Sequence, residues 1–326
     1  MTRSTRTSVP AIPAAPSLRA TVTATAAALA LRPVHNAIPM NPPGIWFGRT
    51  LIATLMAIGG PVPAGSTVTQ VRAGAVRGEW VRAPGVEFGA QAVYYIHGSG
   101  YVLCSARTHR GLAARLSQQT GLPVFVVDYR LAPEHPFPAA ADDIEAGYAW
   151  LLGRYAAADL VIGCDSAGGH LALDLLLEND RRSRPQPAAV AMFSPLLDLT
   201  FGLAAAQERR RPDPLITAHA ASKLPAQYTR GLPADAPRLR LNIPKGTVLP
   251  PILVQAGGTE MLAADARALH AMVRAAGGDC ALEIWPGQVH VFQALPMLVP
   301  EADRALARAA DFLCAAMVTA TVEKVS

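Results

Sequence analysis

A serine in a tight turn between a strand and a helix is the clearest candidate for chemistry. The segment VIGCDSAGGH places Ser166 after a β-branched run, surrounds it with small residues and continues into a helical pattern. Such a turn exposes the hydroxyl at a sheet edge and points a helix N-terminus at the reacting atoms. A phosphate-binding turn would need GxGxxG or GxxxxGK[ST], and the segment has neither. The pattern predicts a nucleophile that attacks carbonyl carbon.

Cys164 precedes this serine by two positions, where glycine is usual. Its Cβ and sulfur must fit where a close backbone approach favours glycine. A second nucleophile at Cys164 is the alternative, but the turn presents Ser166, and a reactive thiolate needs its own basic surroundings. We expect Cys164 to change the local packing and not the attacking group.

A glycine-rich loop offers donors for the negative charge that attack on an ester carbonyl creates. The sequence HGSG follows the β-branched run Ala92–Ile96. Backbone N–H groups in such a loop can point at an oxyanion without obstruction by side chains. We assign the N–H groups of Gly98, Ser99 and Ala167 to an oxyanion hole. The alternative is a plain turn at a strand end.

His290 is the predicted base among the eight histidines. It lies in the loop WPGQVHVF, after the last predicted strand, from which a base would project at the sheet edge. The competitors fall within predicted helices, in the glycine-rich loop, beside prolines or one turn beyond the nucleophile. They are His109, His270, His97, His135 and His170.

Glu260 is the predicted acid because it follows a strand and lies between Ser166 and His290 in the chain. Its task would be to orient the imidazole and stabilise the imidazolium, not to accept the proton. Asp265, one turn further on, is the rival, and we expect it to face solvent or pair locally. A lone carboxylate after a strand is often only a helix N-cap.

The elements that must position these groups alternate between strand and helix from Gly78 onward. The predicted strands are 92–96, 123–127, 160–162, 188–193, 252–255 and 282–285. The predicted helices are 107–120, 138–152, 166–178, 261–276 and 301–318. This alternation predicts an α/β fold, with a mostly parallel central sheet and helices on both faces.

Two segments interrupt or precede this alternation. The first has helical patterns at 18–31 and 46–58, joined by a Pro-rich link, and the second, 199–245, is rich in Pro and Arg. We expect an N-terminal cap segment over residues 1–77 and a core over 78–326. A cap insertion at about 199–245 would cover the carboxyl edge of the sheet, where such folds place their sites.

Composition narrows the function classes. The formal net charge is +5, and the densest basic run, Arg209–Arg211, has no interleaved aromatic residues, so we expect no nucleic-acid partner. The four cysteines lack CxxC or metal-ligand spacing, which predicts no metal and a reduced, cytoplasmic compartment. No stretch approaches the roughly 18 apolar residues of a membrane span. Prolines and Arg19 argue against a signal peptide.

Taken together, these residues resemble the bacterial hormone-sensitive-lipase-like carboxylesterases of the α/β-hydrolase superfamily. The resemblance runs from about 78 to 313 and includes DYRLAPEHPFPAA from Asp128, a family hallmark that braces the oxyanion loop. Three departures are Ser99 in the usual HGGG, Cys164 at the elbow glycine and Cys104 at another glycine. The resemblance implies hydrolysis of short to medium acyl esters, no metal or organic cofactor, and a cap over the acyl pocket.

Two other function classes stay open on sequence. The same triad serves lactonases, amidases and transacylases, because the cap selects the leaving group. A non-catalytic ligand receptor on this fold is also known, in the plant gibberellin receptors, which lose the catalytic histidine. His290 stands in the loop where that histidine belongs, which favours the hydrolase. The expected partner is a small-molecule ester, and a homodimer is left open.

Overall fold

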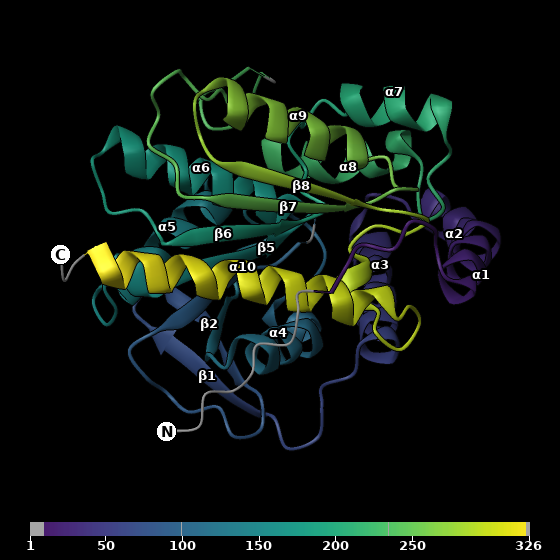
Figure 1. Cartoon of the computed structure of the whole chain (residues 1–326). Helices are drawn as coiled ribbons and strands as arrows, with labels where there is room; N and C mark the ends of the chain where they lie inside the picture. The colour runs from purple at the N-terminus through teal and green to yellow at the C-terminus, as the bar shows by residue number, and fades with distance from the viewer. Residues whose placement is uncertain (1–9, 99, 234, 324–326) are drawn as a thin grey trace.

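An eight-stranded sheet forms the centre of the computed structural model, which describes residues 10–98, 100–233 and 235–323 (Figure 1). The strand order is β1-β2-β4-β3-β5-β6-β7-β8, with parallel pairing from β4 to β8 and antiparallel pairing of β1 and β2. The strands are β1 (Thr67–Ala73), β2 (Val76–Arg82), β3 (Ala92–Ile96), β4 (Val124–Val127), β5 (Leu160–Asp165), β6 (Ala189–Phe193), β7 (Ile252–Gly257) and β8 (Cys280–Trp285). The predicted fold class is confirmed.

Helices cover both faces of the sheet. One face packs against α4 (Ala106–Thr120) and α10 (Glu301–Glu323), and the other against α5 (Ala139–Leu152), α6 (Ala167–Arg181) and α9 (Ala263–Ala275) (Figure 1). Short 3-10 turns, η2 (Ala157–Asp159) and η3 (Phe292–Ala294), lie in the connections. α4, α5, α6, α9 and α10 each begin and end within about five residues of the sequence prediction, whereas the two 3-10 turns were not predicted.

The central strands are buried along their whole length because both faces are covered. Tyr94 and Tyr95 show how β3 divides its side chains between the two cores. The Tyr94 hydroxyl donates to the Ile144 carbonyl at 3.0 Å, and the Tyr95 hydroxyl donates to the Asp165 carboxylate at 2.9 Å. Each buried hydroxyl thus has the partner that burial demands.

The sheet begins earlier than the predicted start of the core. β1 and β2 form an antiparallel hairpin, and β2 pairs with β4 through Gly78 and Val127. A division after residue 77 therefore cuts through β2. The sequence TVTQVRA of β1 did not indicate a strand of the sheet. It lies at the edge, with one side unpaired, and its side chains are mostly exposed.

Two distant parts of the chain supply further helices, which we call the cap. They are α1 (Leu18–Ala26), the π-helical turn η1 (Ala27–Leu31), α2 (Arg32–Ala37), α3 (Pro42–Gly59), α7 (Gly202–Arg210) and α8 (Ala218–Thr229). Pro33 does not break the first of these runs because it occupies the first turn of α2, where proline is tolerated. The Asn36 side chain accepts hydrogen bonds from the Thr217 N–H at 2.9 Å and hydroxyl at 3.0 Å, which joins the two parts.

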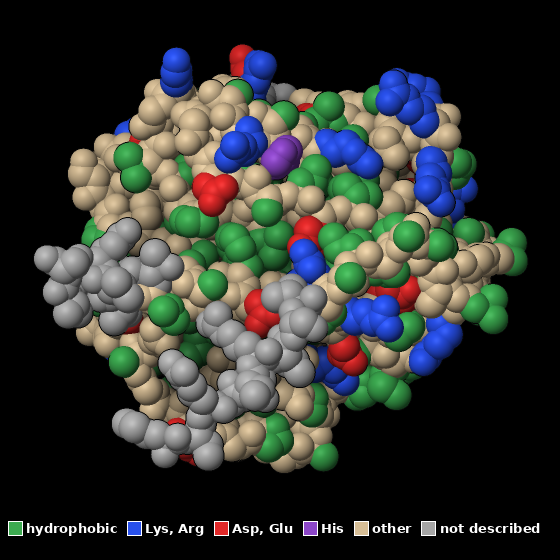
Figure 2. Space-filling model, viewed as in Figure 1, with side chains coloured by type: hydrophobic (Ala, Val, Ile, Leu, Met, Phe, Trp, Pro, Cys, Tyr) green, Lys and Arg blue, Asp and Glu red, His purple; other side chains and the backbone are tan. Residues whose placement is uncertain are grey.

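The surface carries a mixture of charges. Figure 2 shows basic side chains dispersed over one face, with acidic side chains among them. In the described part of the chain, no helix combines the length and apolar character that crossing a bilayer requires.

Candidate active site

Ser166 occupies a strained turn between β5 and α6. Its backbone angles are φ 51° and ψ −123°, which a non-glycine residue adopts rarely. The turn is held by Ser166 N–H, which donates to the Phe193 carbonyl at 2.9 Å. A Cβ added at Gly168 would lie 2.1 Å from the Ile96 carbonyl oxygen, so only glycine fits there. The small residues around Ser166 therefore allow the chain to make this tight turn.

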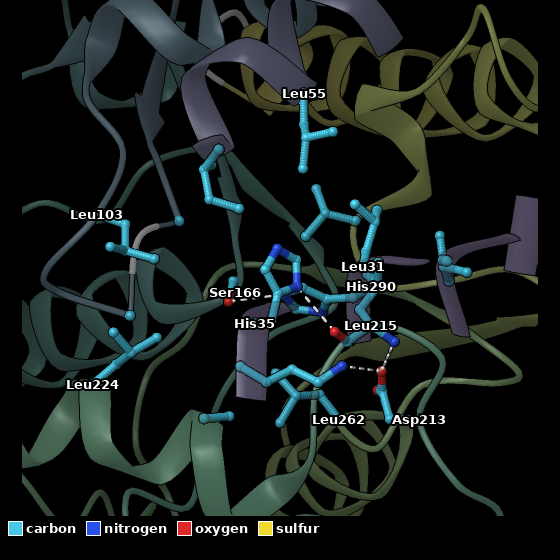
Figure 3. Close-up of a pocket in the computed structure, with 18 of the residues that line it drawn as sticks. Leu31, His35, Leu55, Leu103, Ser166, Asp213, Leu215, Leu224, Leu262 and His290 are labelled. Carbon is cyan, nitrogen blue, oxygen red and sulfur yellow. Dashed lines mark hydrogen bonds between the residues drawn. The ribbon is translucent and has the colours of Figure 1, made fainter. Parts of the chain in front are cut away.

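Ser166, His290 and Glu260 converge at the carboxyl edge of the sheet. His290 Nε2 lies 3.0 Å from Ser166 Oγ (Figure 3). His290 Nδ1 lies 2.5 Å from Glu260 Oε2. Because a carboxylate only accepts, Nδ1 carries the proton and Nε2 is left as the acceptor for the serine hydroxyl. This is the arrangement of nucleophile, base and orienting acid that acyl transfer requires.

Glu260 is fully buried and held by three hydrogen bonds. Besides His290, its carboxylate accepts from the Ser194 hydroxyl at 2.7 Å and from the Gly257 N–H at 2.5 Å. The same Ser194 oxygen accepts from the Val291 N–H at 3.0 Å, which ties the acid to the histidine loop. The sequence did not indicate this link, and the only signal was a Ser-Pro pair after β6.

The electrostatics of the site favour a charged imidazole. Burial is the largest single influence and lowers the pKa of His290, but the nearby carboxylates, Glu260 foremost, together raise the pKa above its ordinary value. Asp213 and Asp165 act in the same direction. A base with a raised pKa takes the serine proton more readily, and the buried carboxylate stabilises the imidazolium that results.

Asp265 makes no described contact with the His290 imidazole. Our expectation that it faces solvent or pairs locally is wrong. Its side chain is fully buried and accepts from the N–H groups of Leu197 and Asp198, both at 2.9 Å. Burial raises its pKa to about 7. Asp265 therefore supports the chain that leaves β6, and the sequence could not show this because those residues lie almost 70 positions away.

The predicted oxyanion donors have different surroundings. Ala167 is the first residue of α6, so its N–H has no partner within the helix and lies at the positive end of the helix dipole. The backbone of Gly98 hydrogen-bonds with the Asp165 carboxylate, which competes with the donor role predicted for Gly98. Gly100, with φ 54°, lines the cavity that opens at Ser166, as Gly98 does. Ser99 lies outside the described residues.

Aromatic and imidazole rings pack against the loop that contains Gly98. The His97 ring stacks on Tyr129 with 4.3 Å between ring centroids, and the Tyr129 hydroxyl donates to the His97 carbonyl at 2.8 Å. Burial lowers the pKa of His97 to about 3, so its ring is neutral. His109 lies within 3.4 Å of the Asp165 carboxylate. The family hallmark segment thus contacts the oxyanion loop through Tyr129.

Cys164 points away from the site. Its side chain is fully buried and its thiol donates to the Ala191 carbonyl of β6 at 3.7 Å. Burial also raises its pKa well above the ordinary value, so no thiolate forms near neutral pH. We therefore expect iodoacetamide to leave Cys164 unmodified in the folded protein and to alkylate it after denaturation, as read by peptide mass spectrometry. Rapid alkylation in the folded state would contradict this placement.

A largely apolar cavity of about 590 Å³ opens at the Ser166 hydroxyl. It lies between the core and both parts of the cap, and Figure 3 shows Leu31, Leu55, Leu103, Leu224 and Leu262 around it. Such a volume and lining suit a small organic molecule. Among the described residues, no three His, Cys, Asp or Glu side chains form a group able to hold a metal ion.

Comparison with known proteins places the chain in a family. The profile of the α/β-hydrolase fold matches residues 93–294. Esterase LipU of Mycobacterium tuberculosis is 35% identical over 265 residues, covering 77% of this chain and 88% of LipU. Carboxylesterase/phospholipase LipF of the same organism is 37% identical over 246 residues, covering 72% of this chain and 65% of LipF.

The solved structures agree. An esterase from the bacterial hormone-sensitive lipase family is 33% identical and superposes with a TM-score of 0.83, covering 93% of this chain and 99% of that one. Fold, motifs and relatives thus coincide over most of the chain. The chain belongs to the α/β-hydrolase family, among the hormone-sensitive-lipase-like esterases that its motifs resemble.

Proposed function

We propose that this protein hydrolyses carboxylic esters of short to medium acyl chains through an acyl-enzyme on Ser166. The observation that carries the proposal is the continuous hydrogen-bonded relay from Ser166 through His290 to Glu260, at 3.0 Å and 2.5 Å. The names of the relatives, esterase and carboxylesterase, support the ester as the bond that is cleaved.

In the proposed reaction, His290 Nε2 takes the hydroxyl proton as Ser166 Oγ attacks the carbonyl carbon. Glu260 stays ionised and stabilises the imidazolium. The carbonyl oxygen becomes negative and accepts hydrogen bonds from the Ala167 N–H and from N–H groups of the loop 98–100. His290 then gives its proton to the leaving alcohol. A water molecule, deprotonated by the same imidazole, attacks the acyl carbon, and the imidazolium returns the proton to Ser166 Oγ as the acid is released.

The cavity indicates the substrate class. Its lining is almost entirely aliphatic near the cap, so an acyl chain gains by leaving water at about 25 cal/mol per Å² of apolar area. Among the described residues, no Lys or Arg lines it to attract a charged acyl group. An uncharged ester with a flexible acyl chain therefore suits the cavity better than a charged one.

The experiment is a hydrolysis screen across p-nitrophenyl esters from acetate to palmitate. We expect turnover to be highest from butyrate to octanoate and to fall for palmitate, as the resemblance to esterases of short to medium acyl chains implies. Phenylmethylsulfonyl fluoride should abolish turnover and add one sulfonyl group to the peptide that carries Ser166. Absence of ester hydrolysis, with turnover of lactones or anilides instead, would replace the proposal by another acyl-transfer reaction on the same residues.

A further inference from the structure

A short stretch of the cap insertion, residues 211–213, lies directly on the loop that carries Glu260. Arg211 Nη1 donates to the Gly258 carbonyl at 3.1 Å, and Asp213 Oδ2 accepts from the Met261 N–H at 2.8 Å. These two contacts flank the residues Thr259 and Glu260. We call the loop that carries Glu260 the acid loop. The cap therefore contacts the acid loop both before and after Glu260, although the cap and the loop are about 50 residues apart in the chain.

Asp213 is the unusual member of this contact. Its side chain is 1% exposed, and its described hydrogen bonds are to backbone N–H groups, of Met261 as above and of Leu215 at 2.8 Å and Ile216 at 3.4 Å (Figure 3). It lines the same cavity as His290 and Ser166. An acidic side chain is costly to bury away from a cation, so its place beside the relay needs a reason.

We propose that Asp213 is a positioning residue, which couples docking of the cap to the orientation of Glu260 and whose charge stabilises protonated His290. The inference rests on the proposed function. Asp213 acts through Glu260 and His290 and does not exchange the proton itself, because its described hydrogen bonds are to main-chain N–H groups and not to the ring.

The charges around His290 agree with this role. The groups that face the imidazole are Glu260 from the acid loop, Asp213 from the cap and Asp165 from the strand before the nucleophile, and each raises the pKa of His290. His35 of α2 lines the same cavity, with its Nδ1 held by the Leu215 carbonyl at 2.9 Å. Burial raises the pKa of Asp213 to about 6, and His290 opposes that rise.

The test compares D213N with a matched cap variant, E208Q. Glu208 also joins cap elements, through Arg32 at 3.0 Å and the Ala218 N–H at 2.8 Å, but does not touch the acid loop. The readouts are the pH profile of kcat/KM for p-nitrophenyl butyrate and the NMR titration of the His290 ring, assigned by its loss in H290F. Neither midpoint depends on the fraction of protein that is folded.

For D213N we expect the acid limb of the profile and the NMR midpoint to move to lower pH by about one unit, because a neighbouring anion is lost. Plateau kcat should fall about tenfold, with KM nearly unchanged, since the interaction acts on the transition state. D213E keeps the charge and should bring the limb back towards wild type. E208Q should leave both midpoints in place.

Unmoved midpoints in D213N, or equal shifts in D213N and E208Q, would overturn the proposal. If the wild-type chain hydrolyses no ester, the proposed function fails by itself. The NMR titration still decides about Asp213 in that case, because it reports on the imidazole without a substrate.

Discussion

The S166A variant should lose about 10⁴- to 10⁶-fold in kcat on p-nitrophenyl butyrate, the range seen when a serine nucleophile is removed from such a relay. Among the described residues, the Ser166 hydroxyl is the hydrogen-bond partner of His290 Nε2. Alanine leaves the imidazole, the acid and the cavity in place but removes the atom that forms the acyl bond. Only the residual effect of binding and oxyanion stabilisation should persist.

The control for this variant is S222A, which changes a serine of α8 whose hydroxyl bonds to its own helix at the His219 carbonyl. We expect its kcat to stay within about twofold of wild type, as for surface substitutions away from special features. Active protein should be counted by sulfonylation with phenylmethylsulfonyl fluoride, which S166A should resist. Undiminished turnover by purified S166A would end the assignment of the nucleophile.

The E260Q variant should lower kcat by about 10³- to 10⁴-fold, the loss seen when the acid of a serine triad becomes an amide. The Glu260 carboxylate accepts from His290 Nδ1 and thereby holds Nε2 free to accept the serine proton. A glutamine nitrogen at that position would favour the opposite tautomer and would not stabilise imidazolium. Buried donors from Ser194 and Gly257 would also lose an ionised acceptor.

The D265N variant is the matched test, because the rival carboxylate is equally buried. One oxygen of Asp265 accepts both N–H groups, of Leu197 and Asp198, and asparagine can keep that oxygen there. With a pKa of about 7, Asp265 is already partly protonated near neutral pH, so the amide resembles its neutral form. We expect kcat to change by less than about tenfold, consistent with no direct contact to the reacting groups.

Stopped-flow hydrolysis and thermal unfolding of the two variants distinguish the roles. E260Q should lose kcat at a folded fraction close to that of wild type, whereas D265N should keep kcat within about tenfold. If D265N proved the more damaging to kcat at equal folded fraction, the acid would have to be assigned to Asp265 and the relay described above would be wrong.

The turn at Ser166 was readable because its requirements are local. Residues within four positions of Ser166 decide whether a strand can turn sharply into a helix, and small side chains are needed at each close approach, as Gly168 against the Ile96 carbonyl shows. The same holds for the alternation of strands and helices, which reflects burial on both faces of a parallel sheet. β1 and β2 were both missed: the edge position of β1 exposes most of its side chains, and β2 contains a glycine and charged residues.

The surroundings of the carboxylates could not be read in this way. Sequence order places Glu260 and Asp265 five positions apart after one strand, and nothing local says which of them reaches an imidazole. Ser194 joins Glu260 to the histidine loop across separations of 66 and 97 residues. Asp213 lies in a Pro- and Arg-rich stretch with no motif to distinguish it.

The sequence by itself thus determined the fold class, the family and the candidates for nucleophile and base, because each depends on a short motif or on the periodicity of burial. For the acid it offered Glu260 with Asp265 as the rival. Only the tertiary structure decided which carboxylate meets His290, that Gly98 bonds to Asp165, and that the cap contacts the acid loop. Those outcomes depend on how distant segments pack at one edge of the sheet, where hydrogen-bond geometry is set by many residues together and by no local pattern.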